Sequence, residues 1–202
     1  MANSSQSKIR NIANPNLPVA PVAYEQRYQD QFSNVIRLYF NQVSNAVNAP
    51  KPHGSFYSTQ DQTNPVADAV NKMTFNQTVS EFNVRIGAIN SRVYVSETAI
   101  YNIQFSAQVD KLGGGNAYMY IWLMINGQNV PNTATKITID GPNAEIVAAW
   151  NFVVPMTEND YFELAWSSPD TDVILSEEPI SGSVPEIPSI ILTVTWVSNV
   201  SV

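Results

Sequence analysis

The hydrophobic residues near the start of the chain recur at helical spacing. Between residues 24 and 47 they fall three or four positions apart, which places them on one face of an α-helix. These residues are Tyr24, Tyr28, Phe32, Val35, Tyr39, Val43, Ala46 and Val47. Ile36, Leu38 and Phe40 widen the face. The Ala49–Pro50 pair ends the pattern, because a residue that precedes proline disfavours helical backbone. The pattern predicts one amphipathic helix.

From residue 53 onward the pattern changes to an alternation of apolar and polar residues. In "AIYNIQFSAQV", Tyr101, Ile103, Phe105, Ala107 and Val109 point to one face, and polar residues point to the other. The runs "AYMYIWLMI", "EIVAAWNFVVP", "DYFELAWSS" and "IILTVTWVS" are also strand-like, and turns rich in Gly, Pro and Asn separate them. Many short strands with no long helix between them predict a mainly β fold, an antiparallel sandwich or jelly roll.

The first 23 residues are polar and then punctuated by prolines. Pro15, Pro18 and Pro21 stand three residues apart, a spacing that favours an extended or polyproline II backbone without internal hydrogen bonds. Such a segment should not hold one conformation alone, so we expect a neighbouring subunit or a partner to hold it. We therefore divide the chain into an extended arm (1–23), an amphipathic anchoring helix (24–50) and a β domain (51–202).

A helix with so much aromatic surface must bury it against something. Two alternatives stay open: the helix packs on its own domain, or it anchors the chain in an assembly. In the second case we expect the contacts from Tyr24, Tyr28, Phe32, Val35, Tyr39 and Val43, together with the arm prolines Pro15, Pro18 and Pro21.

The charge is unevenly distributed along the chain. Residues 1–50 carry four basic and two acidic residues, which is 4 − 2 = +2, and the remainder carries 6 − 15 = −9, for a total of −7. The acidic β domain argues against nucleic acid as a partner, because phosphate binding depends on clustered Lys and Arg. No apolar run approaches the roughly 20 residues of a membrane span, and no signal-peptide pattern is present, so we expect a soluble protein made in a cytoplasm.

The sequence offers little catalytic or metal-binding chemistry. It has no cysteine and one histidine, His53, with no second histidine to partner it. The triple glycine at 113–115 is not followed by a Lys-Ser/Thr pair, which argues against a phosphate loop and for a hairpin tip. Asp170 and Asp172 are weak calcium candidates, because oxygen ligands stand close together there. We expect no enzyme activity and no cofactor.

The strands resemble the C1q/TNF-like jelly roll. Ala99, Tyr101 and Ile103 stand in its first strand motif, Asn126–Gly127 in the turn that ends a later strand, and Asn159–Asp160 where the family has Gly-Asp. The segment "NLPVAPVAYEQRYQDQFSNVIRLYFNQ" resembles the start of virion structural proteins of tailed phages, particularly those of marine and cyanobacterial hosts. Together these resemblances imply a homotrimer whose arm and helix attach it to a virion.

The leading hypothesis is a phage capsid decoration or cement protein, located on the capsid surface and bound to the major capsid protein. The alternative is a trimeric head or tail fibre or spike tip that binds a host receptor. In that case the loops at 110–117 and 167–186 form the recognition surface.

Overall fold

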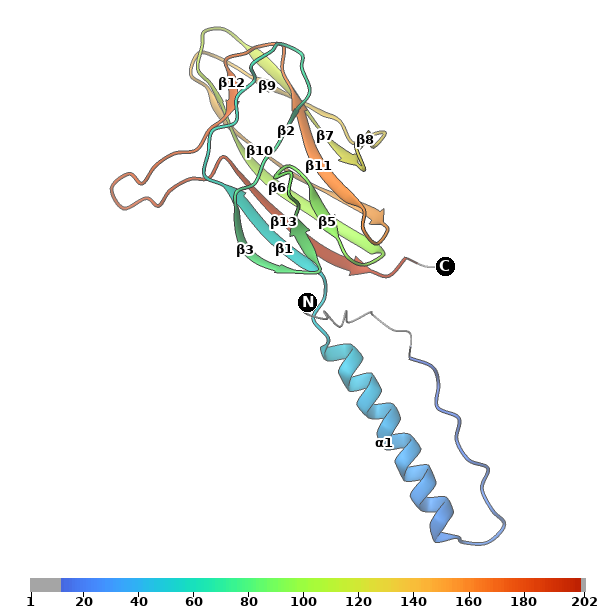
Figure 1. Cartoon of the computed structure of the whole chain (residues 1–202). Helices are drawn as coiled ribbons and strands as arrows, with labels where there is room; N and C mark the ends of the chain where they lie inside the picture. The colour runs from blue at the N-terminus through green and yellow to red at the C-terminus, as the bar shows by residue number, and fades with distance from the viewer. Residues whose placement is uncertain (1–11, 201–202) are drawn as a thin grey trace. The chain divides into compact units, whose positions relative to one another are not determined.

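The structure is a computed structural model, and it describes residues 12–200. The chain divides after Pro50 into two compact units, an N-terminal unit with a single helix and a C-terminal β unit (Figure 1). Within the described residues, no helix combines the length and the hydropathy that crossing a membrane requires.

The helix of the N-terminal unit is α1 (Gln26–Asn48). Glu25 precedes it in extended conformation and makes no side-chain capping bond. Ala49 ends it with φ −63° and ψ 133°, the extended region that a following proline favours. The helix was expected to begin at residue 24, so Tyr24 lies just before the helix instead of on it.

Thirteen strands make up the C-terminal unit. In chain order they are β1 (His53–Ser58), β2 (Asn71–Lys72), β3 (Gln77–Phe82), β4 (Val84–Ile86), β5 (Val93–Val95), β6 (Ala99–Lys111), β7 (Ala117–Ile125), β8 (Gln128–Asn129), β9 (Thr135–Ile139), β10 (Glu145–Met156), β11 (Tyr161–Ser167), β12 (Val173–Leu175) and β13 (Ile190–Ser198). The pairs between these strands are antiparallel.

The strands form two sheets. Sheet 1 has the order β10-β6-β13-β1-β3, with β12 also paired to β6, and sheet 2 has the order β4-β5-β11-β7-β8, with β2 on β11 and β9 on β7. The first and last long strands, β1 and β13, are neighbours, and the chain crosses repeatedly between the sheets. This is the arrangement of a double-sheet jelly roll. The prediction of a mainly β, antiparallel jelly roll preceded by one helix is confirmed.

The hydrophobic core lies between the two sheets. The alternate residues of β6 that were expected to share a face are buried there, including Tyr101, Ile103 and Phe105. Trp166 on β11 is fully buried in the same core. The expected Asn126–Gly127 turn follows β7, and both residues have positive φ (50° and 77°), as the hairpin turn preferred by Asn-Gly requires.

Candidate assembly surfaces

The described part of the arm, residues 12–23, forms no helix or strand, and it is half-buried at every third position up to Pro21. Its half-buried residues are Ile12, Pro15, Pro18 and Pro21, and their neighbours are exposed. A period of three matches the three residues per turn of polyproline II, so these side chains line up along one edge. The three prolines singled out from the sequence are thus half-buried and share this spacing.

The arm packs on α1 of its own chain. Asn16, Leu17 and Pro18 line one cavity together with Gln31, Asn34 and Val35 of α1. Figure 1 shows the arm running back along the helix. The arm thus has a contact within its own chain, and the expectation that a subunit or partner holds it stays a prediction. A proline edge and an aromatic helix face are both apolar, so they cover each other in part.

The helix residues predicted to make contacts divide between two environments. Half-buried positions form the stripe Tyr28, Phe32, Val35, Ile36, Tyr39, Val43 and Ala46, whereas Tyr24 is 80% exposed. The rings of Tyr28 and Phe32 stack with their centroids 6.1 Å apart.

A second part of the helix surface stays open. No residue of α1 is fully buried, and Phe40 and Val47 are 62% and 71% exposed. With Ile36 and Val43, these residues follow the spacing 4-3-4, which makes a continuous ridge along one flank of the helix. We call Ile36, Phe40, Val43 and Val47 the open flank. All four belong to the wide apolar face predicted from the sequence, but the periodicity alone did not show that Phe40 and Val47 stay exposed.

The outer face of sheet 1 is uncharged across its centre. The outward side chains of β6, β10 and β13 in this central region are Asn102, Gln104, Ser106, Gln108, Val147, Ala149, Asn151, Val153, Ile191, Thr193, Thr195 and Val197. Val147, Val153, Ile191 and Val197 are between 45% and 59% exposed. A neutral face with exposed valines is suited to contact with another protein.

Sheet 2 carries a buried carboxylate on its outer face. Glu163 lies on β11 between the core residues Phe162 and Leu164, yet its side chain is only 1% exposed. Lys72 Nζ lies 2.7 Å from it and Arg92 Nε 3.6 Å, and the Ser91 hydroxyl donates to Oε1 at 2.8 Å. This cluster was missed because nothing in the sequence links residues so far apart.

The two calcium candidates, Asp170 and Asp172, differ in their contacts. Asp170 accepts a bond from the fully buried Lys111 at 2.6 Å and another from the Asp172 backbone N–H at 2.9 Å. The bond from Lys111 holds the pKa of Asp170 below its ordinary value. Asp170 is thus already paired with a cation. In the described part of the chain, no three His, Asp or Glu side chains gather as metal ligands.

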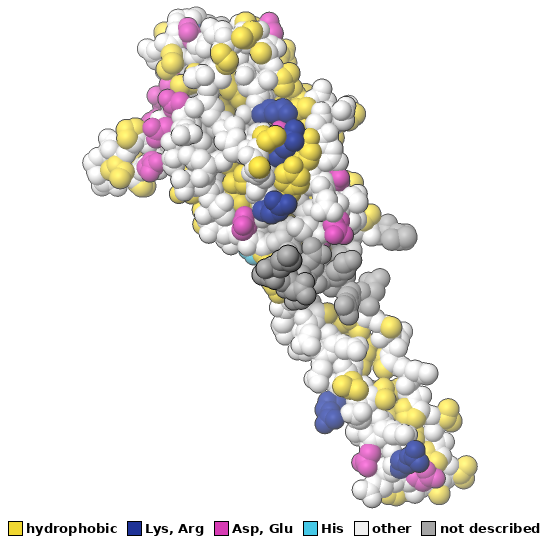
Figure 2. All heavy atoms as spheres, in the orientation of Figure 1, with side chains coloured by type: hydrophobic (Ala, Val, Ile, Leu, Met, Phe, Trp, Pro, Cys, Tyr) yellow, Lys and Arg dark blue, Asp and Glu magenta, His cyan; other side chains and the backbone are white. Residues whose placement is uncertain are grey.

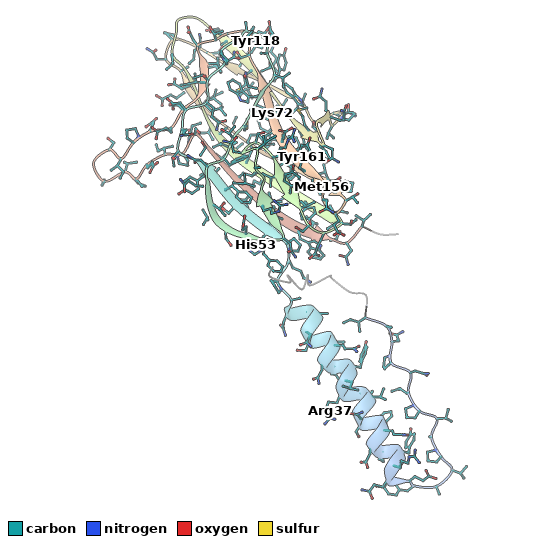
Figure 3. The ribbon with its side chains drawn as sticks, viewed as in Figure 1. Arg37, His53, Lys72, Tyr118, Met156 and Tyr161 are labelled. Atoms are coloured by element: carbon teal, nitrogen blue, oxygen red, sulfur yellow. The ribbon has the colours of Figure 1, made fainter. Side chains whose placement is uncertain are left out.

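His53 joins two strands of sheet 1. Its Nδ1 lies 2.8 Å from the Lys51 carbonyl oxygen, which can only accept, so Nδ1 carries the hydrogen. Its Nε2 then accepts from the Ser80 hydroxyl at 3.1 Å. Both nitrogens are engaged in structural bonds between β1 and its surroundings (Figure 3).

A projecting hairpin, residues 176–188, overlaps the second predicted recognition loop (167–186). Backbone bonds join Glu178 to Ile187 in both directions at 2.9 Å, and Ser181 to Val184 at 3.0–3.2 Å. Gly182 has φ 61° at the tip, which suits a tight two-residue turn. The first loop is the short link 112–116 between β6 and β7.

Comparison with known proteins finds similarity among solved structures but none to family models or curated proteins. No protein-family model matches the chain, and no curated protein matches it. Among solved structures, the globular domain of zebrafish complement 1qA protein is similar over 74% of this chain and 99% of that chain, with a TM-score of 0.45 and 10% sequence identity.

Proposed function

We propose that the chain is a trimeric decoration or cement protein of a phage capsid, and that the N-terminal unit attaches it to the major capsid protein. The observation that carries the proposal is the open flank of α1. A helix with no fully buried residue and with Phe40 and Val47 exposed keeps apolar surface in water, which favours burial in a partner.

The two units suit separate tasks. The N-terminal unit bears the open flank, whereas the C-terminal unit has a complete core of its own. The neutral outer face of sheet 1 supports a trimer, because three copies can bury it without desolvating a charge. A trimer presents three N-terminal units at once, so weak single contacts add through avidity. The task is mechanical and requires no catalytic group.

Capsid binding by a flank variant tests the proposal. The double substitution Phe40→Asn and Val47→Asn removes apolar surface from the open flank, and we expect it to reduce co-sedimentation with particles of the encoding virus by at least about tenfold. The matched control is Asn41→Ala and Gln42→Ala, which changes exposed polar residues of the same helix turn.

Unchanged binding by the flank variant overturns the attachment proposal. Saturable binding of the unmodified protein to host cells, with none to particles, supports instead the alternative of a receptor-binding tip. Both measurements use the full chain, and circular dichroism verifies that the flank variant keeps its helix.

A further inference from the structure

Sheet 2 carries a cluster of positive charge on an otherwise acidic unit. Three of the six basic residues in 51–202 lie in it: Lys72, Arg85 and Arg92. Only one carboxylate, Glu163, is paired with them, so the cluster carries 3 − 1 = +2 within a unit of net charge −9. Figure 2 shows Lys and Arg side chains in separate patches on one face of this unit, with hydrophobic side chains between and around them.

The two arginines of this basic cluster are held in place by tyrosines. Arg85 lies opposite Tyr94 in the β4–β5 pair, and its Cζ is 5.2 Å from the centre of the Tyr94 ring. Arg92 covers the Tyr161 ring at 4.5 Å, and the two tyrosine rings are 5.3 Å apart. The guanidinium groups are thereby ordered before any ligand arrives, which lowers the entropy cost of binding an anion.

Part of the positive charge of the basic cluster remains available to bind an anion. Arg85 is exposed and pairs with no carboxylate of the described chain. Arg92 keeps 30% of its side chain exposed, and Lys72 keeps 35%. A guanidinium with free N–H groups prefers a carboxylate that can accept two bonds at once.

The hairpin 176–188 carries the opposite charge to the basic cluster. It carries Glu177, Glu178 and Glu186, and none of these forms an ion pair within residues 12–200. Near its tip, Ile180 and Val184 are 72% and 51% exposed. Figure 1 shows the hairpin extending away from both sheets, on the link between β12 and β13.

We propose that the hairpin 176–188 of one copy docks on the basic cluster of a second copy. Glu178 and Glu186 face Arg85 and Arg92, and the apolar tip rests on the hydrophobic rim of the cluster. The contact uses the outer face of sheet 2 and leaves the outer face of sheet 1 free for the trimer. It therefore links one trimer to the next, a step beyond the attachment proposed above.

Two variants break the contact from opposite sides. The first variant, Arg85→Glu, reverses the charge of a cluster residue that lies over the Tyr94 ring. The second, Glu178→Lys with Glu186→Lys, reverses the charge of two hairpin residues. The matched control is Lys136→Glu, because Lys136 also covers a tyrosine of sheet 2, Tyr118, at 4.0 Å but lies on β9.

Sedimentation velocity of the full chain at low and high salt measures association beyond the trimer. We expect the unmodified protein to associate at low salt and to dissociate at high salt, because screening weakens exposed ion pairs. Each of the two variants lowers the association constant about tenfold, and the Lys136→Glu control matches the unmodified protein. A mixture of the two variants regains association, since one variant has an intact cluster and the other an intact hairpin.

Three results overturn the proposal: association that neither variant changes, a mixture no stronger than its components, or no association of the unmodified protein at low salt. A fourth result also overturns the proposal. If the unmodified protein is retained on a sulfated-polysaccharide column, Arg85→Glu is not retained, and the hairpin variant still associates normally, the basic cluster binds an external polyanion instead of the hairpin. The trimer is measured in the same runs, so a failure of trimer formation is distinguished from a failure of this contact.

Discussion

Gly54 lies on β1 where a neighbouring side chain fills the space that its own would need. A Cβ there would stand 2.5 Å from Cε2 of the fully buried Phe56 and 3.0 Å from Val84. We expect Gly54→Ala to lower the free energy of unfolding by about 2 kcal/mol through overpacking. Gly114→Ala is the control, because no atom lies within 4 Å of a Cβ there. Urea unfolding of both proteins measures the difference, and equal losses would contradict the packing account.

The ion pair of Lys111 and Asp170 predicts how stability depends on pH. The pKa of Asp170 is held below its ordinary 3.8 by the bond from Lys111. A depressed folded-state pKa stabilises the fold above pH 3.8, and this contribution is lost as the pH falls through the folded-state pKa. We expect Asp170→Asn to cost about 2–3 kcal/mol at neutral pH, because it leaves a buried lysine unpaired while Asp170 itself is 28% exposed.

This cost should shrink in acid, where Asp170 of the unmodified protein is protonated. Chemical unfolding at neutral and acidic pH measures the change. Asp172→Asn serves as the control: it alters the neighbouring exposed carboxylate, which forms no ion pair in the described chain, and should change stability by less than about 0.5 kcal/mol. A cost of Asp170→Asn that is the same at both pH values would contradict the pairing.

Single residues also show what the sequence could predict. The core face of β6 follows from strict alternation, since side chains of a strand point to opposite faces in turn. Glu163 and Lys111 occur in similar alternating runs, but both are buried. Their partners Lys72 and Asp170 are 91 and 59 positions away. Only the folded sheets bring such charges together, so local pattern cannot reveal them.

At the scale of elements, the arm lies beside α1 and shares a cavity with it. Each was predictable from its own period, three for the prolines and three or four for the helix face. Their packing on each other was not, because two apolar edges match a partner protein equally well. Against the predicted segment 24–50, α1 begins two residues later and ends two residues earlier, because hydrophobic periodicity does not fix helix ends.

The exposure of α1 predicts its dynamics. The backbone hydrogen bonds of α1 lack a covering core, whereas β6 lies within sheet 1 between β10 and β13. We expect the amides of α1 to exchange hydrogen orders of magnitude faster than those of β6 when the protein is alone. Hydrogen exchange with mass spectrometry measures both, and bound particles should slow α1 selectively. Equal protection of α1 and β6 in the free protein would contradict an open flank.

At the scale of the whole molecule, the neutral face of sheet 1 predicts how copies associate. Alternating strands made the jelly roll predictable, but the uncharged face emerges only when β10, β6 and β13 align in register. Its outward residues, such as Val153 and Asn102, come from strands distant in sequence and lie opposite each other. The trimer thus stays a prediction that depends on this surface.

Val153→Asp tests the trimer directly. Val153 is 57% exposed on the edge strand β10, so a carboxylate there is hydrated in the single chain and should leave its fold intact. In a trimer that buries this face, the same charge is desolvated without a partner, at a cost of several kcal/mol per copy. Light scattering should therefore report trimers for the unmodified protein and monomers for the variant. The control Val66→Asp changes a valine that is 60% exposed in a loop outside sheet 1, and it should remain trimeric. A trimeric Val153→Asp protein would move the interface to another face of the jelly roll.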